Sequence, residues 1–115
     1  MPYILIHLPW LRVNGLALFP FIFVQQPNPS KQLLNHEKIH LRQQVELLLI
    51  PFYLWYVLEY WLNLFKYPTR FEAYYFISFE QEAYKNDYDL SYLKQRKLWA
   101  FLGYFPEKAK KKRKG

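Results

Sequence analysis

A histidine, a glutamate and a second histidine stand at the spacing that binds catalytic zinc. His36, Glu37 and His40 form the pattern H-E-x-x-H, within the string NHEKIHLRQQVE over residues 35–46. Positions i and i+4 of a helix lie about 40° apart and one turn along the axis, so both imidazoles can face one ion. Glu37 then lies beside the metal, where it can take a proton from a metal-bound water. The pattern predicts a zinc hydrolase; the alternative is the same string on a solvated helix that binds no metal.

The absence of cysteine restricts how this chain can hold a metal. Zinc ribbons, iron–sulfur clusters, disulfide frameworks and thiol nucleophiles are all excluded, because none of the 115 residues is a cysteine. The available ligands are three histidines and nine acidic residues. A catalytic zinc needs a third protein ligand and an open fourth position, so one more donor must come from this small set.

Helix geometry ranks the nearest candidates for the third ligand. Glu46 lies six residues after His40, but six residues advance a helix by about 600°, which turns Glu46 away from the metal. The metzincin spacing overcomes this with a glycine, and this chain has Gln43 at that position. Gln43 is seven residues from His36 and nearly in register with it, so it is expected to line the same face as a polar neighbour of the site.

Two acidic residues on a later helical segment, Glu80 and Glu82, remain as third ligands. Here the chain resembles a known family. The pattern H-E-x-x-H, followed tens of residues later by E-x-E-A, resembles the gluzincin metallopeptidases, especially the bacterial heat-shock membrane proteases and the antibiotic-sensor metalloproteases. The resemblance implies that Glu80 is the third zinc ligand and Glu37 the catalytic base. It also implies Zn²⁺ as the cofactor and a peptide or protein as the substrate.

One position departs from the gluzincin pattern. The family places an aspartate four residues after the third ligand, where it supports a ligand histidine, and this chain has Tyr84 there. Asp87, seven residues after Glu80 and so on the same helical face, can substitute for that aspartate. The strings over residues 35–46 and 77–84 also resemble a group of small uncharacterised bacterial proteins that are taken to be metallopeptidases.

Strand signals at the N-terminal end predict a small sheet. Residues 3–8 and 16–24 are rich in β-branched and aromatic residues, and Asn14-Gly15 predicts an antiparallel hairpin between them. Pro20 confines the second strand to an edge or a bulge, because proline cannot donate to the ladder. In gluzincins an edge strand beside the active-site helix pairs with the peptide substrate, so the resemblance implies binding by strand addition. The side chains expected on this substrate strand are Leu16, Leu18, Phe19, Phe21 and Phe23.

The remaining elements are expected to be helices. Ser30 is a plausible N-cap for a helix over residues 31–50 or beyond, which carries the H-E-x-x-H string. The string KYPTR at residues 66–70 ends the next helical stretch, and further helices are expected over residues 71–87 and 91–102. The fold class is therefore α+β and mainly helical, with the N-terminal hairpin packed on the two helices that carry the metal ligands.

One domain over residues 1–106 and a basic disordered tail over residues 107–115 are expected. The tail contains six basic residues and one acid, which leaves only +2 of the net charge of +7 on the rest of the chain. No specific nucleic-acid partner is therefore expected. The tail is expected either to keep the protein soluble or to attract anionic lipid headgroups or nucleic acid without sequence specificity.

An apolar run over residues 47–58, LLLIPFYLWYVL, is too short to cross a membrane and contains Pro51. We interpret it as a kinked core helix or as a helix that lies on a membrane surface. Since the N-terminus lacks the basic start of a secretory signal, a cytoplasmic location is expected, with membrane association as an extension of it. The competing function is a non-catalytic metal-binding or docking protein that uses this aromatic helix and the basic tail.

Overall fold

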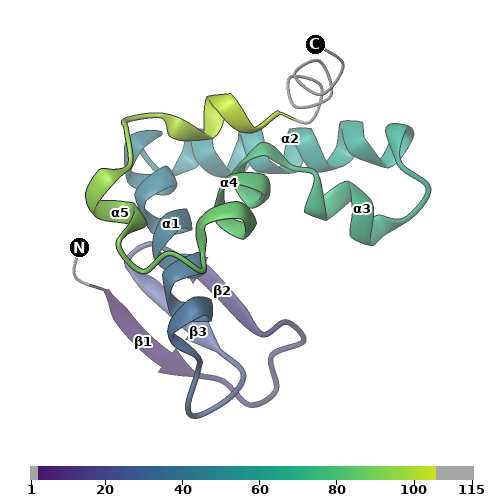
Figure 1. Cartoon of the computed structure of the whole chain (residues 1–115). Coiled ribbons are helices and arrows are strands. Elements are labelled where there is room, and N and C mark those ends of the chain that lie inside the picture. The colour runs from purple at the N-terminus through teal and green to yellow at the C-terminus, as the bar shows by residue number, and fades with distance from the viewer. Residues whose placement is uncertain (1–2, 106–115) are drawn as a thin grey trace.

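The N-terminal end of the chain forms a three-stranded sheet, and most of the rest is helical (Figure 1). The computed structural model describes residues 3–105, so the predicted basic tail lies outside the described residues. The strands are β1 (Ile4–His7), β2 (Gly15–Leu18) and β3 (Phe21–Val24), and their order in the sheet is β1-β3-β2. The predicted α+β, mainly helical class is confirmed.

The pairing of the strands corrects the predicted hairpin. β1 does not pair with β2; it runs parallel to β3, with Ile4 opposite Phe21. The antiparallel hairpin is formed by β2 and β3, with Gly15 opposite Val24. The single strand predicted over residues 16–24 is divided by a turn at Pro20, a residue that cannot donate to a sheet ladder.

Only part of the predicted substrate strand lies at a sheet edge. Leu16 and Leu18 belong to β2, which is an edge strand, whereas Phe21 and Phe23 belong to the central strand β3. Phe19 lies in the turn between them. Since β3 is paired on both sides, it has no free edge for another chain. Strand addition beside the H-E-x-x-H helix is therefore restricted to β2.

The first helix, α1 (Lys31–Glu46), carries the H-E-x-x-H string and packs on β2 and β3. Its N-terminus is capped as predicted, because Ser30 Oγ accepts a hydrogen bond from the N–H of Leu33 at 3.0 Å. α1 ends four residues before the predicted Ile50. The chain turns there through Leu48 and Leu49, which both have a positive φ.

The second helix, α2 (Ile50–Lys66), is separate from α1 and bent from it by 115°. Pro51 lies in its first turn, where the missing N–H costs no helical hydrogen bond. The apolar run had suggested a continuous helix kinked at Pro51. Pro51 instead lies at the start of a separate helix. Among the described residues, no single helix is long and apolar enough to cross a membrane, although α1 and α2 pass that test as a bent pair.

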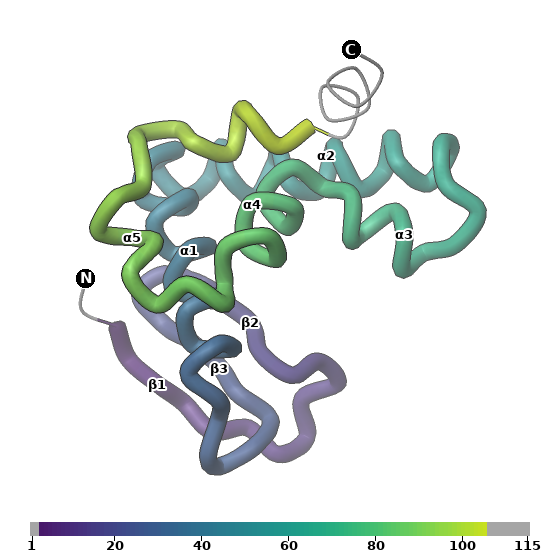
Figure 2. Tube along the Cα trace, in the orientation of Figure 1, coloured from purple at the N-terminus to yellow at the C-terminus, as the bar shows by residue number. Residues whose placement is uncertain are grey.

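Two predicted helices are each divided by a break. Residues 71–87 form α3 (Arg70–Tyr75) and α4 (Ser78–Asn86), and Thr69 caps α3 by accepting from the N–H of Glu72 at 3.1 Å. Residues 91–102 form α5 (Tyr92–Gln95) and the first part of a 3-10 helix, η1 (Ala100–Tyr104). The Cα trace shows α4 beside α1, and α2 and α3 extending together away from the sheet (Figure 2).

Two clusters of apolar side chains fix the helices that carry the predicted ligands. Phe79 of α4 packs between Phe52 and Phe101, with ring centroids 4.5 Å and 4.6 Å away. The other cluster joins α1 to the sheet and contains Ala17, Ile22, Val24 and Leu41. Burying a large apolar side chain contributes roughly 1.5–3 kcal/mol, so each cluster holds its helix firmly.

Arg96 ties the two ligand-bearing helices together by a buried network of ion pairs. Its guanidinium binds Glu82 of α4 through Nε and Nη2, and Glu46 of α1 through Nη1 and Nη2. The side chain of Arg96 is fully buried, and those of both glutamates nearly so. No local sequence pattern predicts this role for Arg96, because it lies 14 residues from one partner and 50 from the other.

Replacing Arg96 by methionine is expected to lower the free energy of unfolding by about 3–5 kcal/mol, because two buried carboxylates lose their countercharge. Urea denaturation at pH 7 measures this loss. The matched control is Lys94→Met, which removes an exposed positive charge from α5 and should change the stability by less than about 0.5 kcal/mol. Equal, small effects of the two substitutions would show that Arg96 does not hold the helices together.

Candidate metal centre

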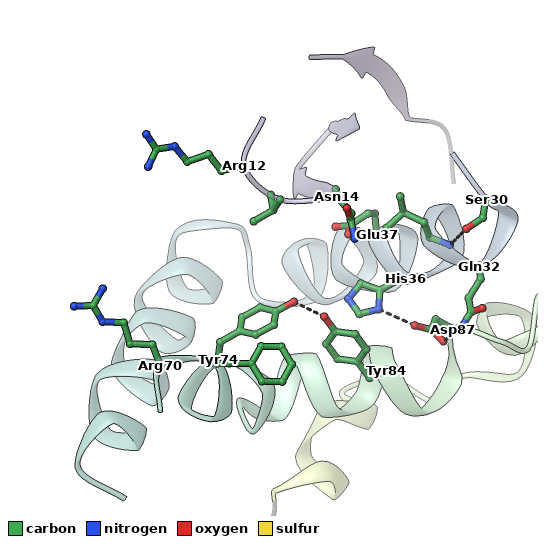
Figure 3. A pocket seen from close by; sticks show the side chains of 14 residues that line it. Arg12, Asn14, Ser30, Gln32, His36, Glu37, Arg70, Tyr74, Tyr84 and Asp87 are labelled. Atoms are coloured by element: carbon green, nitrogen blue, oxygen red, sulfur yellow. Dashed lines mark hydrogen bonds and ion pairs between the residues drawn. The ribbon is translucent and has the colours of Figure 1, made fainter. Parts of the chain in front are cut away.

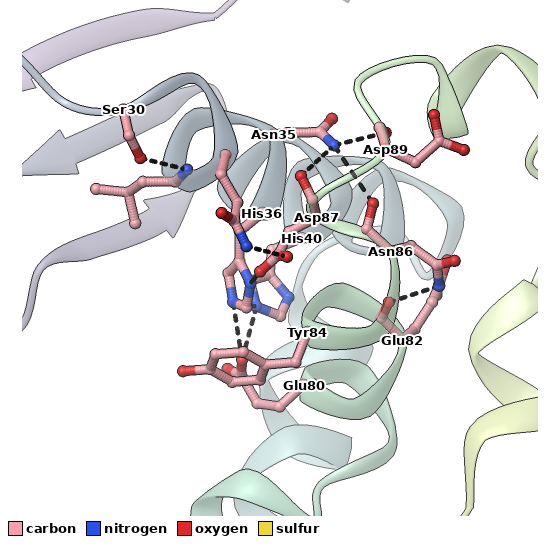
Figure 4. A network of polar contacts seen from close by, with 12 residues as sticks. Ser30, Asn35, His36, His40, Glu80, Glu82, Tyr84, Asn86, Asp87 and Asp89 are labelled. Carbon is pink, nitrogen blue, oxygen red and sulfur yellow. Dashed lines mark hydrogen bonds and ion pairs between the residues drawn. The ribbon is translucent and has the colours of Figure 1, made fainter.

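Three buried side chains from α1 and α4 converge on one point (Figure 4). Glu80 Oε1 lies 3.1 Å from His36 Nε2 and 3.0 Å from His40 Nε2, and the two nitrogens are 3.2 Å apart. Each of the three residues is at most 5% exposed. Bonds of about 2.0–2.1 Å in a tetrahedral zinc site place the ligand atoms about 3.3 Å from one another. The three atoms therefore already have nearly the spacing that such an ion requires.

The outer nitrogen of each imidazole faces an acceptor, which fixes the tautomer of the ring. His36 Nδ1 lies 3.0 Å from Asp87 Oδ2, and His40 Nδ1 lies 2.8 Å from Gln43 Oε1. The orientation of Gln43 is itself fixed, because its Nε2 donates to Glu82 and to a backbone carbonyl of α4. Both Nδ1 atoms must then donate, and in a neutral ring the lone pair of Nε2 points to the shared point.

Asp87 makes the contact to His36 that the gluzincin pattern would assign to an aspartate at position 84, where this chain has Tyr84. Two side chains of α1 hold it there: Gln32 Nε2 donates to Asp87 Oδ1 at 2.8 Å, and Asn35 Nδ2 donates to the backbone oxygen of Asp87 at 2.9 Å. Asn35 also donates to the backbone oxygen of Asp89 at 2.9 Å. The turn after α4 is therefore fastened to α1 directly beside the histidines.

Three phenols surround the carboxylate of Glu80 and its neighbours. Tyr56 donates to Glu80 Oε2 at 2.5 Å, and Tyr74 donates to Oε1 at 3.3 Å. Tyr84, predicted as a supporting residue, packs its ring against His36 with centroids 4.4 Å apart and shares a hydrogen bond of 2.7 Å with Tyr74. Burial, together with the charge of Glu80, raises the pKa of Tyr56 and Tyr74, so both phenols remain donors.

The remaining acidic candidates for the third ligand are occupied elsewhere. Glu46 and Glu82 both bind Arg96, and Glu82 also accepts hydrogen bonds from Tyr92 and Gln43. Of the two alternatives that the sequence left open on α4, the structure thus brings Glu80 to the histidines.

The histidines and Glu80 stabilise each other's charged forms. Burial lowers the pKa of His40, but the charge of Glu80 and the hydrogen bond between them outweigh burial and raise that pKa to about 9. Burial likewise raises the pKa of Glu80, and His40 and His36 more than reverse this, so the pKa lies well below its usual range. In the absence of a bound cation, His40 is therefore protonated at neutral pH and Glu80 is ionised.

Glu37 lies beside the three donors, as the motif predicts. A Cβ atom on Gly15 of β2 would lie only 3.0 Å from Glu37 Oε2, so the glycine leaves room for this carboxylate. Burial raises the pKa of Glu37, and the charges of His40 and His36 oppose that effect. A carboxylate with a raised pKa is a stronger base than an exposed one, which suits it to accept and then return a proton.

Two cavities meet at Glu37, and the smaller of them runs along β2. The larger, about 650 Å³, includes Arg12, Arg70 and Asp87 in its lining (Figure 3). The smaller, about 380 Å³, is lined mainly by apolar and aromatic side chains of β2 and α2 and by the three donors. The two cavities share Val13, Gly15, His36, Glu37 and Tyr74.

No protein-family model matches this chain, and no curated protein or solved structure matches it either. The functional assignment must therefore be argued from the geometry of the site.

Zinc binding at pH 7 is expected to release about one proton, because His40 must lose the proton that Glu80 stabilises. The release should vanish above a pH of about 9, the pKa of His40. Isothermal titration calorimetry in two buffers of different ionisation enthalpy measures the proton count. His7→Gln, which changes an exposed histidine on β1, serves as the control and should release the same number. No proton release at pH 7 would contradict the coupling of His40 to Glu80.

Removing the charge of Asp87 is expected to weaken zinc binding by about 10–100-fold, because the carboxylate orients His36 and increases its basicity. The test is Asp87→Asn, with zinc affinity measured by competition with a chelator. Asp89→Asn is the matched control, since the side chain of Asp89 accepts from Ser91 and not from a histidine. Equal affinities of both variants for zinc would remove Asp87 from its supporting role.

Proposed function

We propose that this chain is a zinc-dependent metallopeptidase of gluzincin type with a minimal zincin-like fold. His36, His40 and Glu80 bind the metal, and Glu37 is the general base. The observation that carries this proposal is the convergence of three buried donor atoms at distances of 3.0–3.2 Å. The resemblance to gluzincins also implies an edge strand beside the H-E-x-x-H helix and a third ligand on a later helix. In this chain β2 lies beside α1, and Glu80 lies on α4.

The residues present fit zinc in both number and chemistry. Two imidazoles and one carboxylate leave a fourth tetrahedral position open, which is the arrangement of catalytic zinc. The fourth position is accessible, because all three donors line the smaller cavity. When bound there, zinc lowers the pKa of a coordinated water towards neutrality and polarises a carbonyl group.

Glu37 supplies the acid–base chemistry. Its carboxylate lines both cavities next to the three donors, so it lies within the space where a peptide bond would be cleaved. There it accepts a proton from the attacking water and passes it to the nitrogen of the leaving amine. Burial raises the pKa of Glu37, which favours the protonated form needed for the second step.

The two cavities suggest how a peptide lies in the site. An extended chain that adds to the free edge of β2 runs past Glu37 with one part in each cavity. The smaller cavity, where Leu16, Phe52 and Val57 contribute apolar surface, fits an apolar side chain. The larger cavity carries the exposed cations Arg12 and Arg70, which Figure 3 shows extending on the same side, so it fits an acidic or carboxylate group.

Replacing Glu37 by glutamine is expected to retain one zinc per chain and to lower the rate of peptide hydrolysis by about 10²–10⁴-fold. Zinc content is measured by elemental analysis of protein purified without metal-affinity resin. Hydrolysis is followed with a library of quenched fluorescent peptides. Glu72→Gln is the matched control, because the side chain of Glu72 accepts from Thr69 and does not line either cavity.

Two results would contradict the proposal in different ways. Stoichiometric zinc without any hydrolysis by the unmodified chain would favour the non-catalytic metal-binding alternative. Undiminished hydrolysis by Glu37→Gln would remove Glu37 from the role of general base, whatever the metal content.

A further inference from the structure

The helix α2 directs three polar side chains inward, together with Phe52, and exposes a series of large apolar side chains. Glu59 faces the body of the protein and accepts hydrogen bonds from the N–H and the Oγ of Ser78, at 2.9 Å and 2.5 Å. Asn63 is buried and donates to the backbone oxygen of Ala73 at 3.0 Å. Tyr56 faces inward as well, to Glu80. An ordinary surface helix has the opposite arrangement.

The outward face of α2 consists of large apolar side chains over its whole length. Phe65 is 79% exposed, Leu54 67% and Trp61 57%. At 100° per residue the face covers an arc of about 160° and ends at Lys66. The exposed residues of this face are Ile50, Leu54, Val57, Leu58, Trp61, Leu62, Leu64 and Phe65. We call these eight residues the outer face of α2.

Exposed apolar residues continue past both ends of this helix. Leu48, in the turn before α2, is 80% exposed, and Phe71, at the start of α3, is 66% exposed. Monomeric soluble proteins rarely expose a continuous apolar patch of this extent, and larger patches mark contact with another molecule or a membrane. α2 is 17 residues long, about 25 Å, which is shorter than the hydrocarbon thickness of about 30 Å.

We propose that the outer face of α2 docks onto the surface of an anionic lipid bilayer, with the helix lying in the plane of the interface. The charge of the chain favours a bilayer over a second copy of the chain as the molecule that covers this face. The net charge is +7, of which +5 lies in residues 107–115, so two copies of the full chain repel each other, whereas an anionic surface attracts it. Trp61 suits the depth of the headgroups, because its indole combines an apolar ring with one N–H donor.

The docked orientation brings the smaller cavity to the membrane surface. Val57 belongs to the outer face of α2, is 62% exposed and also lines that cavity. Leu16 and Leu18 of β2 line the same cavity and are 40% and 39% exposed. An apolar surface thus leads from the outer face of α2 into the cavity. Docking itself does not depend on zinc or on hydrolysis, so it can be tested separately from the proposed function.

Sedimentation with vesicles tests the docking. The full chain is mixed with vesicles of phosphatidylcholine alone or of phosphatidylcholine with phosphatidylglycerol. Binding to the anionic vesicles is expected, and the double variant Leu54→Glu with Trp61→Glu should bind at least about tenfold more weakly. The control variant, Ile4→Glu with Leu5→Glu, makes the same change of charge at exposed positions on β1 and should bind within about twofold of the unmodified chain.

Circular dichroism melting shows whether each variant is folded, and both substituted pairs are exposed, so their melting temperatures should be close to that of the unmodified chain. Equal loss of binding in both double variants would overturn the proposal, because charge alone would then explain it. A concentration-dependent dimer that the Leu54→Glu, Trp61→Glu variant abolishes, without any vesicle binding, would assign the outer face of α2 to a second copy instead.

Discussion

The packing of α1 against α4 depends on how two buried imidazoles and one buried carboxylate are satisfied. Burying such groups is costly unless each polar atom has a partner. Here the outer nitrogens of the imidazoles face Asp87 and Gln43, and the carboxylate accepts from Tyr56 and Tyr74. When both rings are neutral, one Nε2 lone pair from each ring and a carboxylate oxygen of Glu80 are directed inward. Without a cation, the proton that His40 holds at neutral pH lies between these atoms. A divalent cation would satisfy all three atoms at once, and this is why we propose a metal centre here.

The rest of the fold holds these two helices in register. The sheet supports α1, and the aromatic cluster around Phe79 supports α4 one residue before Glu80. Arg96 joins Glu46, the last residue of α1, to Glu82 in the middle of α4. On β2, Gly15 leaves room for Glu37, and this strand, Glu37 and the three donor residues all line the smaller cavity. α2 also lines the smaller cavity, and its exposed apolar face is the surface that we propose docks onto lipid.

The features that the sequence predicts and the structure also has are mostly local ones. The spacing of His36 and His40, the position of Glu37 between them and the cap at Ser30 all follow from helix geometry. Glu80 needed the resemblance to gluzincins, since no local rule separates it from Glu82; their different partners appear only in three dimensions. The substitution of Asp87 for the missing aspartate was predicted from its register on the helical face and agrees with its contact to His36.

The errors share a physical cause. The pairing of β1 with β3 and the partners of Arg96 both depend on contacts between segments distant in the chain, which periodicity does not encode. The central claim is that one ion binds to His36, His40 and Glu80. Anomalous diffraction at the zinc absorption edge tests it most directly. We predict a single peak about 2.0–2.2 Å from both Nε2 atoms and from Glu80 Oε1; no peak at this position, or a zinc bound through Glu82 instead, would contradict the assignment.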